Sequence, residues 1–219
     1  EPMAPLEKHP FASYGFPWHR THTIKRTVQG TSLNWSGFYA KSKKSVKHSV
    51  SHVSGTWTVP VITPATSHTY AYIWVGMDGA SNHTIEQIGT GHKWGNGVQE
   101  NIAWFQMYPH RSFRIKRFPI APGDQISGEV RYVGDGLFSL QLKNWTQGVV
   151  FEVPPKFARS EHAHRSTADW MVSLPADHHT LLPLANFTTI TFADCWTKIH
   201  GLKGAIGLTR WNNAPITMT

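Results

Sequence analysis

Strict alternation of residue type along segment 70–78 limits the fold more than any other feature of the chain. Even positions carry aromatic, small or acidic residues, and odd positions carry mostly aliphatic ones. Side chains alternate between the two faces of a β-sheet, so this pattern predicts a strand with one aliphatic and one aromatic, polar-tipped face. The aliphatic face suits the core between two sheets, and the aromatic face suits a ligand-binding groove rather than a cover against solvent. The even positions hold Tyr70, Tyr72, Trp74, Gly76 and Asp78; the odd positions hold Ala71, Ile73, Val75 and Met77.

The segment 103–108 shows the same alternation, and further short β-like runs follow along the chain. Turn-forming clusters such as Pro122-Gly123-Asp124 and Gly134-Asp135-Gly136 separate these runs. Many short strands with little helical periodicity predict an all-β fold, an antiparallel two-sheet sandwich. The other predicted strands are 53–59, 84–89, 112–118, 126–133, 137–143, 148–152, 168–173, 188–193 and 203–209.

Length and composition set the outer limits of this prediction. A chain of 219 residues suffices for one large β-domain, for which we expect a monomer. No run of 18 apolar residues is present, so we expect no membrane span. The Pro-rich segment 1–30 lacks periodicity and is interpreted as an N-terminal arm or a retained pro-segment, followed by the β-domain at 31–219. Because the chain starts at Glu1 without an apolar targeting core, we expect that a signal peptide has been removed or never existed.

The chain is strongly basic, with 21 Lys and Arg against 13 Asp and Glu and a formal charge of +8. Basic residues gather in the first fifty positions, which is typical either of a well-solvated face or of a surface for an anionic polymer. No nucleic-acid-binding module accompanies the charge, so we expect no specific nucleic-acid partner.

The sequence contains none of the common motifs for metal binding, serine-hydrolase catalysis or phosphate binding. His162 and His164, like His178 and His179, are close in sequence but lie outside any H-E-x-x-H or Cys-His pattern, so we expect no metal site. No G-x-S-x-G turn and no phosphate-binding glycine loop occurs, and we expect no cofactor. The single cysteine, Cys195, is expected to be buried rather than nucleophilic.

An amide and a carboxylate remain as candidates. Alternation places Gln87 on one face with Ile85 and Gly89, and places Asp169 on one face with Met171 and Ser173. The two side chains can therefore meet in a groove. A solvated or hydrogen-bonded carboxylate is the alternative for Asp169.

Short motifs follow one another along the chain: Asn34-Trp35-Ser36-Gly37, Ser54-Gly55-Thr56-Trp57-Thr58-Val59-Pro60, Trp74-Val75-Gly76-Met77-Asp78-Gly79, Gln87-Ile88-Gly89, Ala103-Trp104-Phe105-Gln106-Met107-Tyr108-Pro109, Ala168-Asp169-Trp170-Met171-Val172 and Pro183-Leu184-Ala185-Asn186-Phe187. In order and spacing they resemble motifs of the glutamic peptidases (eqolisins), from about residue 33 to the C-terminus.

The resemblance implies a concanavalin-like sandwich with a concave cleft and a secreted (extracellular or periplasmic) acid endopeptidase acting on polypeptides. It implies that Asp169 is the general base and acid, in the place of the family's Glu, and that Gln87 positions the attacking water and binds the oxyanion. It also implies that further residues line or support the substrate cleft. These are Trp35, Trp74, Asp78, Trp104 and Gln106.

The chain departs from the family pattern at several positions. Asp169 is one methylene shorter than Glu, and a misplacement of ~1 Å can cost ~100-fold in rate. Gln106 stands where the family usually has Glu, and segment 91–94, interpreted as a loop, carries basic residues. Two alternatives therefore stay open: a catalytically degenerate relative that binds peptides or glycans, and a surface protein that binds anionic polymers through its basic arm.

Overall fold

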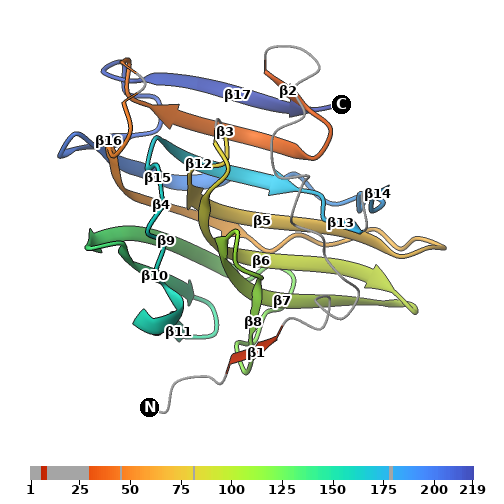
Figure 1. Ribbon diagram of the computed structural model, residues 1–219. Helices are drawn as coiled ribbons and strands as arrows, with labels where there is room; N and C mark the ends of the chain where they lie inside the picture. Colours follow the sequence, from red (N-terminus) through yellow and green to blue (C-terminus); the bar gives the residue numbers. More distant parts are fainter. Residues whose placement is uncertain (1–5, 9–29, 45, 81, 178–179) are drawn as a thin grey trace.

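Two large β-sheets contain most of the strands among the described residues, which include no α-helix. In Figure 1 the strands of each sheet run side by side across the molecule. The predicted all-β two-sheet sandwich is therefore confirmed. None of the described residues belongs to a helix long and apolar enough to cross a bilayer. The computed structural model describes residues 6–8, 30–44, 46–80, 82–177 and 180–219.

The larger sheet has nine strands in the order β1-β8-β7-β6-β5-β12-β3-β17-β2. Its neighbours are antiparallel except for β17 and β2, which run parallel. In chain order the bounds are β1 (Leu6–Lys8), β2 (Thr31–Ser32), β3 (Trp35–Lys41), β5 (Thr69–Met77), β6 (Ile85–Gly95), β7 (Val98–Tyr108), β8 (Phe113–Ile115), β12 (Thr167–Ser173) and β17 (Asn212–Met218).

The smaller sheet has six antiparallel strands in the order β11-β10-β9-β4-β15-β16. A short 3₁₀ turn, η2 (Pro155–Phe157), follows β11, and β13 (Ala176–Asp177) pairs with β14 (Thr180–Leu181) apart from both sheets. The strands of the smaller sheet are β4 (Val50–Thr58), β9 (Gln125–Gly134), β10 (Leu137–Asn144), β11 (Val149–Glu152), β15 (Phe192–Ile199) and β16 (Leu202–Ala205).

The main apolar core lies between the two sheets. Of the odd-numbered aliphatic residues in 70–78, Ile73, Val75 and Met77 are all buried in it, as the alternation predicts. Trp170 of β12 is fully buried and donates its indole N–H to the Ser54 carbonyl of the facing sheet at 2.9 Å. A Cβ on Gly55 would lie 2.7 Å from the Trp170 ring, so the close approach of the sheets there depends on glycine. Burying each large side chain stabilises the fold by about 1.5–3 kcal/mol.

A second apolar cluster covers the opposite face of the larger sheet. Its rings pack edge to face: Trp35 and Trp74 have centroids 5.0 Å apart, and Tyr72 and Trp104 have centroids 5.5 Å apart. The Trp74 indole N–H donates to the Ser173 hydroxyl at 3.0 Å. All four rings are at most 3 % exposed, so this face is not a solvated one. The cluster consists of Trp35, Tyr72, Trp74, Ile85, Ile102, Trp104, Tyr108, Met171 and Ile216.

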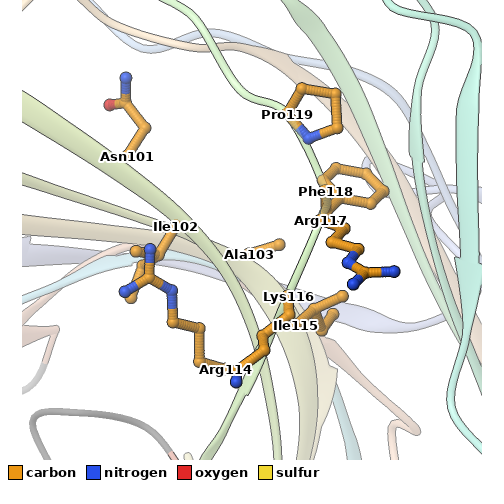
Figure 2. Close-up of a pocket in the computed structure, with 9 residues that line it drawn as sticks. All are labelled: Asn101, Ile102, Ala103, Arg114, Ile115, Lys116, Arg117, Phe118 and Pro119. Atoms are coloured by element: carbon orange, nitrogen blue, oxygen red, sulfur yellow. The ribbon is translucent and has the colours of Figure 1, made fainter. Parts of the chain in front are cut away.

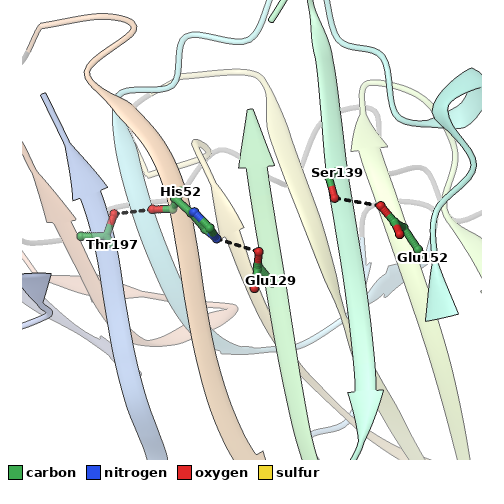
Figure 3. A network of polar contacts seen from close by, with 5 residues as sticks. All are labelled: His52, Glu129, Ser139, Glu152 and Thr197. Carbon is green, nitrogen blue, oxygen red and sulfur yellow. Dashed lines mark hydrogen bonds and ion pairs between the residues drawn. The ribbon is translucent and has the colours of Figure 1, made fainter. Parts of the chain in front are cut away.

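The outer face of the smaller sheet is polar. Figure 3 shows side chains bridging neighbouring strands there, with His52 Nε2 2.8 Å from the Glu129 carboxylate and the Ser139 hydroxyl donating to Glu152 at 3.1 Å. The buried Thr197 hydroxyl, on the core side of β15, donates to the His52 carbonyl at 2.7 Å, whereas the side-chain pairs of His52 and Ser139 lie on the outer side. Such cross-strand pairs suit a face that meets water, so buried chemistry is to be sought on the larger sheet.

Several predicted boundaries are wrong. Segment 91–94 is not a loop but the second half of β6, where Gly91 leaves room for the Tyr72 ring. The strand expected at 188–193 corresponds to β15, which begins four residues later, at Phe192. The strand expected at 203–209 corresponds to β16, which ends at Ala205. Strands β3 and β17 have no counterpart among the predicted strands.

The N-terminal segment is described only in part. Its residues 6–8 form β1, which pairs with β8 in the register Leu6 to Ile115. Residues 1–5 and 9–29 lie outside the described residues, so the division into an arm at 1–30 and a domain at 31–219 stays a prediction.

Candidate active site

Gln87 and Asp169 lie in one row across the larger sheet. Gln106 of β7 is in register with Gln87 of β6, Gln87 with Gly76 of β5, and Gly76 with Asp169 of β12. Directly opposed residues in a sheet point to the same face. The amide and the carboxylate therefore share the aromatic face, with their backbones two strand spacings, or about 9.6 Å, apart.

Gly76 occupies the position between them and leaves it without a side chain. A Cβ at this position would lie 2.7 Å from the Glu86 carbonyl oxygen and 3.0 Å from the Gln87 Cβ. A larger residue would therefore displace β6 and fill the space over which the two polar side chains can approach each other. The alternation in 70–78 predicts this face for Gly76, but no sequence signal marks the residue as important.

Hydrogen bonds fix the orientation of the Gln87 amide. Its Nε2 donates to the Gln106 Oε1 at 3.0 Å, and the Gln106 Nε2 donates to the His110 carbonyl at 2.8 Å. Both amides are buried. An amide nitrogen carries two N–H bonds, so Gln87 can donate one further hydrogen bond from a fixed position.

Asp169 is a buried acid with one oxygen engaged. Its Oδ2 accepts a hydrogen bond from the Thr167 hydroxyl at 2.8 Å, whereas its buried Oδ1 has no hydrogen-bond partner among the described residues. Burial raises the pKa of Asp169 well above the usual range, against the Thr167 hydrogen bond, and Asp78 raises it further. An incompletely paired, buried titratable group is characteristic of functional sites.

The model of the Peptidase A4 family matches residues 33–214. The chain belongs to this family. Comparison with curated protein sequences gives no match. Among solved structures, the fold is similar to that of scytalido-glutamic peptidase bound to a transition state analog inhibitor, at 24 % identity and a TM-score of 0.66 over 79 % of this chain and 84 % of that one.

Two further solved structures share the fold of this Peptidase A4 family member. SCP-B, an eqolisin in complex with the tripeptide Ala-Ile-His, is 23 % identical at a TM-score of 0.63, covering 78 % of this chain and 82 % of that one. Aspergilloglutamic peptidase from Aspergillus niger is 24 % identical at a TM-score of 0.52, covering 62 % of this chain and 80 % of that one. The resemblance noted from the sequence motifs is thus confirmed at the level of family and fold.

Asp78 of this Peptidase A4 family member directly follows β5 and is surrounded by hydrogen-bond donors. Its fully buried carboxylate accepts from Asn82 Nδ2 at 2.8 Å, Thr84 Oγ1 at 3.2 Å, the Ser166 N–H and hydroxyl at 2.8 Å each, and the Arg165 N–H. These contacts tie the loop after β5 to the residues that lead into β12. Asp78 thus supports the strand that carries Asp169, and a direct substrate contact stays a prediction.

The other predicted substrate-binding residues have different surroundings. Trp35, Trp74 and Trp104 are buried in the second apolar cluster beside the row of Gln87 and Asp169. Gln106 contacts Gln87 directly. A role for the three tryptophans in contacting substrate stays a prediction, because the structure shows them packed inside the cluster.

Two titratable residues near the row lie on the opposite face of β6. Glu86 is fully buried, and burial together with the nearby Asp78 raises its pKa well above the usual range. His92 is also buried, which lowers its pKa to about 4; it lies between Thr90 and Asn101 at hydrogen-bond distance. Neither shares the face of Gln87 and Asp169.

The described residues include no group of three His, Cys, Asp or Glu arranged to hold a metal ion. His178 and His179, singled out in the sequence, lie outside the described residues.

Asp169→Asn should change the pH dependence of stability in this A4-family chain. Because folding raises the pKa of Asp169, the folded state keeps a proton that the unfolded state releases above about pH 3.9. The parent therefore loses stability as pH rises from that value toward the folded pKa, and asparagine removes this loss. We expect the variant to gain stability relative to the parent at pH 7 but not at pH 3, measured by urea unfolding. Parallel stability profiles for the two proteins would contradict this account.

Proposed function

We propose that this chain is an endopeptidase in which Asp169 and Gln87 act together on a peptide bond of an extended polypeptide. The observation that carries the proposal is their common face over the side-chain-free Gly76, with the Gln87 amide oriented by Gln106. Membership of a peptidase family supports it. Secretion, expected from the sequence resemblance, is part of the same proposal.

The reaction needs only groups that these residues supply. The ionised Asp169 carboxylate takes a proton from a water molecule, and the resulting hydroxide attacks the carbonyl carbon of the peptide bond. The Gln87 N–H donates to the oxygen that becomes negatively charged. Asp169 then transfers its proton to the leaving nitrogen as the C–N bond breaks, which restores the carboxylate.

The environment of Asp169 sets the expected pH range. A general base must be ionised, and burial raises the pKa of Asp169. We therefore propose that the acidic limb of the activity profile lies above the ordinary aspartate pKa of about 3.9. Such an enzyme would work under less acid conditions than one whose carboxylate has an unshifted pKa.

Gln87→Ala should lower kcat by about 10²–10³-fold, because it removes one oxyanion donor. The test is cleavage of acid-unfolded casein between pH 2 and pH 7, with new amino termini counted. Because both side chains are buried, the assay should include the full chain and a variant that starts at residue 30. The proposal is wrong if neither folded protein cleaves at any pH, or if Gln87→Ala cleaves as fast as its parent.

The aromatic residues give little support to the alternative that this protein binds glycans without catalysis. A protein that stacks glycans needs an exposed ring, whereas Trp35, Trp74 and Trp104 are at most 1 % exposed. If Gln87 and Asp169 do not catalyse cleavage, the remaining alternative is a protein that binds peptides without cutting them.

A further inference from the structure

A basic pocket lies beside the larger sheet, where β8 ends. It measures about 610 Å³ and opens between β7 and the segment that follows β8. Figure 2 shows the Arg114 side chain extending toward Ile102, while the Arg117 guanidinium points away on the other side. The lining residues are Asn101, Ile102, Ala103, Arg114, Ile115, Lys116, Arg117, Phe118 and Pro119.

Strand register connects this pocket with the face that carries Gln87 and Asp169. Arg114 is in register with Trp104, Trp104 with Gly89, and Gly89 with Trp74. This second row lies two residues along the strands from the row of Gln87, so both rows point to the same face. Arg114 therefore ends the row of aromatic residues that borders the proposed dyad.

The described residues that line the pocket carry an excess of positive charge. They include three cations, Arg114, Lys116 and Arg117, and no acid, while Glu7 of β1 lies in register with Arg114 at the edge of the sheet. Arg114 contacts the Glu100 carboxylate at 3.5 Å, but the two side chains are 30 % and 44 % exposed. A pair this exposed is weak, so an incoming carboxylate can compete for the guanidinium. Arg117 is exposed at the pocket rim.

The structure also limits the direction from which a ligand can reach Arg114. The edge of β8 that faces away from β7 is paired with β1, so a ligand cannot reach Arg114 by adding a strand directly to β8. It must present a side chain to the pocket from the face of the sheet. A flexible carboxylate side chain meets this requirement and matches the charge of the lining.

We propose that the pocket lined by Arg114, Lys116 and Arg117 binds an acidic side chain of the polypeptide substrate. This inference rests on the proposed function, because it takes Gln87 and Asp169 as the site of cleavage. Two strand spacings and two residues along the strand separate Gln87 from Arg114, or about 12 Å between backbones. An extended peptide spans that distance in about four residues at ~3.3 Å each. The pocket lies beyond Gln87 and away from Asp169, so the acidic residue is selected three to five positions from the scissile bond, on one side only.

The test uses the full chain and peptides that share one cleavage sequence. A single Asp is scanned through the five positions on each side of the scissile bond, with Asn at the same position as the neutral reference. We expect Asp to lower KM by about fivefold three to five positions away on one side, with kcat unchanged. Arg117→Glu should abolish or reverse this preference. Arg114→Gln, which removes the charge without placing a new carboxylate beside Glu100, should reduce it.

Lys198→Glu is the matched control, because Lys198 is exposed on the smaller sheet. It makes the same charge change away from the pocket and should leave the preference intact. A preference that is absent, or that survives Arg117→Glu and Arg114→Gln, overturns the proposal. Loss of preference in the Lys198→Glu control also overturns it, since net charge would then explain the effect.

A binding measurement separates this inference from the proposed function. Fluorescence anisotropy of the labelled Asp and Asn peptides is measured with the parent and with Asp169→Asn, at low and high salt. Tighter binding of the Asp peptide that depends on Arg117 and weakens with salt supports the pocket even if nothing is cleaved. Equal binding of the two peptides contradicts the pocket even if the parent cleaves both.

Discussion

Replacing Asp169 with asparagine should lower kcat/KM for peptide cleavage by roughly 10⁴-fold or more, the scale seen when a general base is removed. Asparagine has nearly the same shape and can still accept the Thr167 hydrogen bond, but it cannot take a proton from water. The loss should therefore occur without unfolding, which circular dichroism and urea unfolding at the assay pH would check. Unchanged turnover in a folded Asp169→Asn protein would remove the proposed base from the mechanism.

Asp169→Glu is the companion variant, since it keeps the acid and changes its length. The added methylene moves the carboxylate by about 1.5 Å. Gly76 places no side chain between positions 169 and 87, so we expect the longer side chain to extend toward Gln87 and cleavage to proceed at least as fast as in the parent. Steady-state kinetics of the three proteins at one pH separates the need for an acid from the need for its present length. A glutamate variant as inactive as asparagine would show that length, and not only proton transfer, limits the reaction.

Asp78→Ala should destabilise the fold by about 3–5 kcal/mol, although Asp78 has no part in the proposed chemistry. The substitution removes the acceptor of five hydrogen bonds from Asn82, Thr84, Arg165 and Ser166, and leaves these buried and half-buried donors without it. Urea unfolding at a fixed pH measures the loss.

Asp78→Asn serves as the control for shape. It retains one carbonyl oxygen as an acceptor and should lose less stability than alanine. A loss below about 1 kcal/mol for Asp78→Ala would contradict the role assigned to these hydrogen bonds. Activity should fall with stability in both variants, because the same contacts position the start of β12.

The alternation of side chains made the central part of the fold predictable. In segments 70–78 and 103–108 the period of two assigns each residue to a face, and the structure places most of those residues as expected. The same rule put Gln87 and Asp169 on definite faces of their strands. It could not show that these faces coincide, since this depends on the pairing of β12 with β5, about ninety residues apart in the chain.

Local composition is a poor guide to secondary structure where tertiary packing overrides it. A loop is predicted at 91–94, yet β6 continues through this segment because the Tyr72 and Ile102 side chains fill the space above Gly91. Strand β17 is hard to predict because it contains Asn212, Asn213 and Pro215, which are uncommon in strands. Its pairing with β3 holds it in the sheet. The donors around Asp78 come from positions 82–84 and 165–166, and only the folded chain brings these together.

Alignment between β6 and β5 decides what kind of chemistry this sheet can support. Glu86 and Gln87 are neighbours on opposite faces, so displacing β6 by one residue would exchange an amide for an acid opposite Asp169. Two carboxylates at such a site tend to share one proton, as in a different class of acid protease. Gly89 stands against this exchange, because any side chain brought to its position would collide with the Ile73 carbonyl. A residue that carries no functional group thus keeps the amide and the acid, rather than two acids, on the working face.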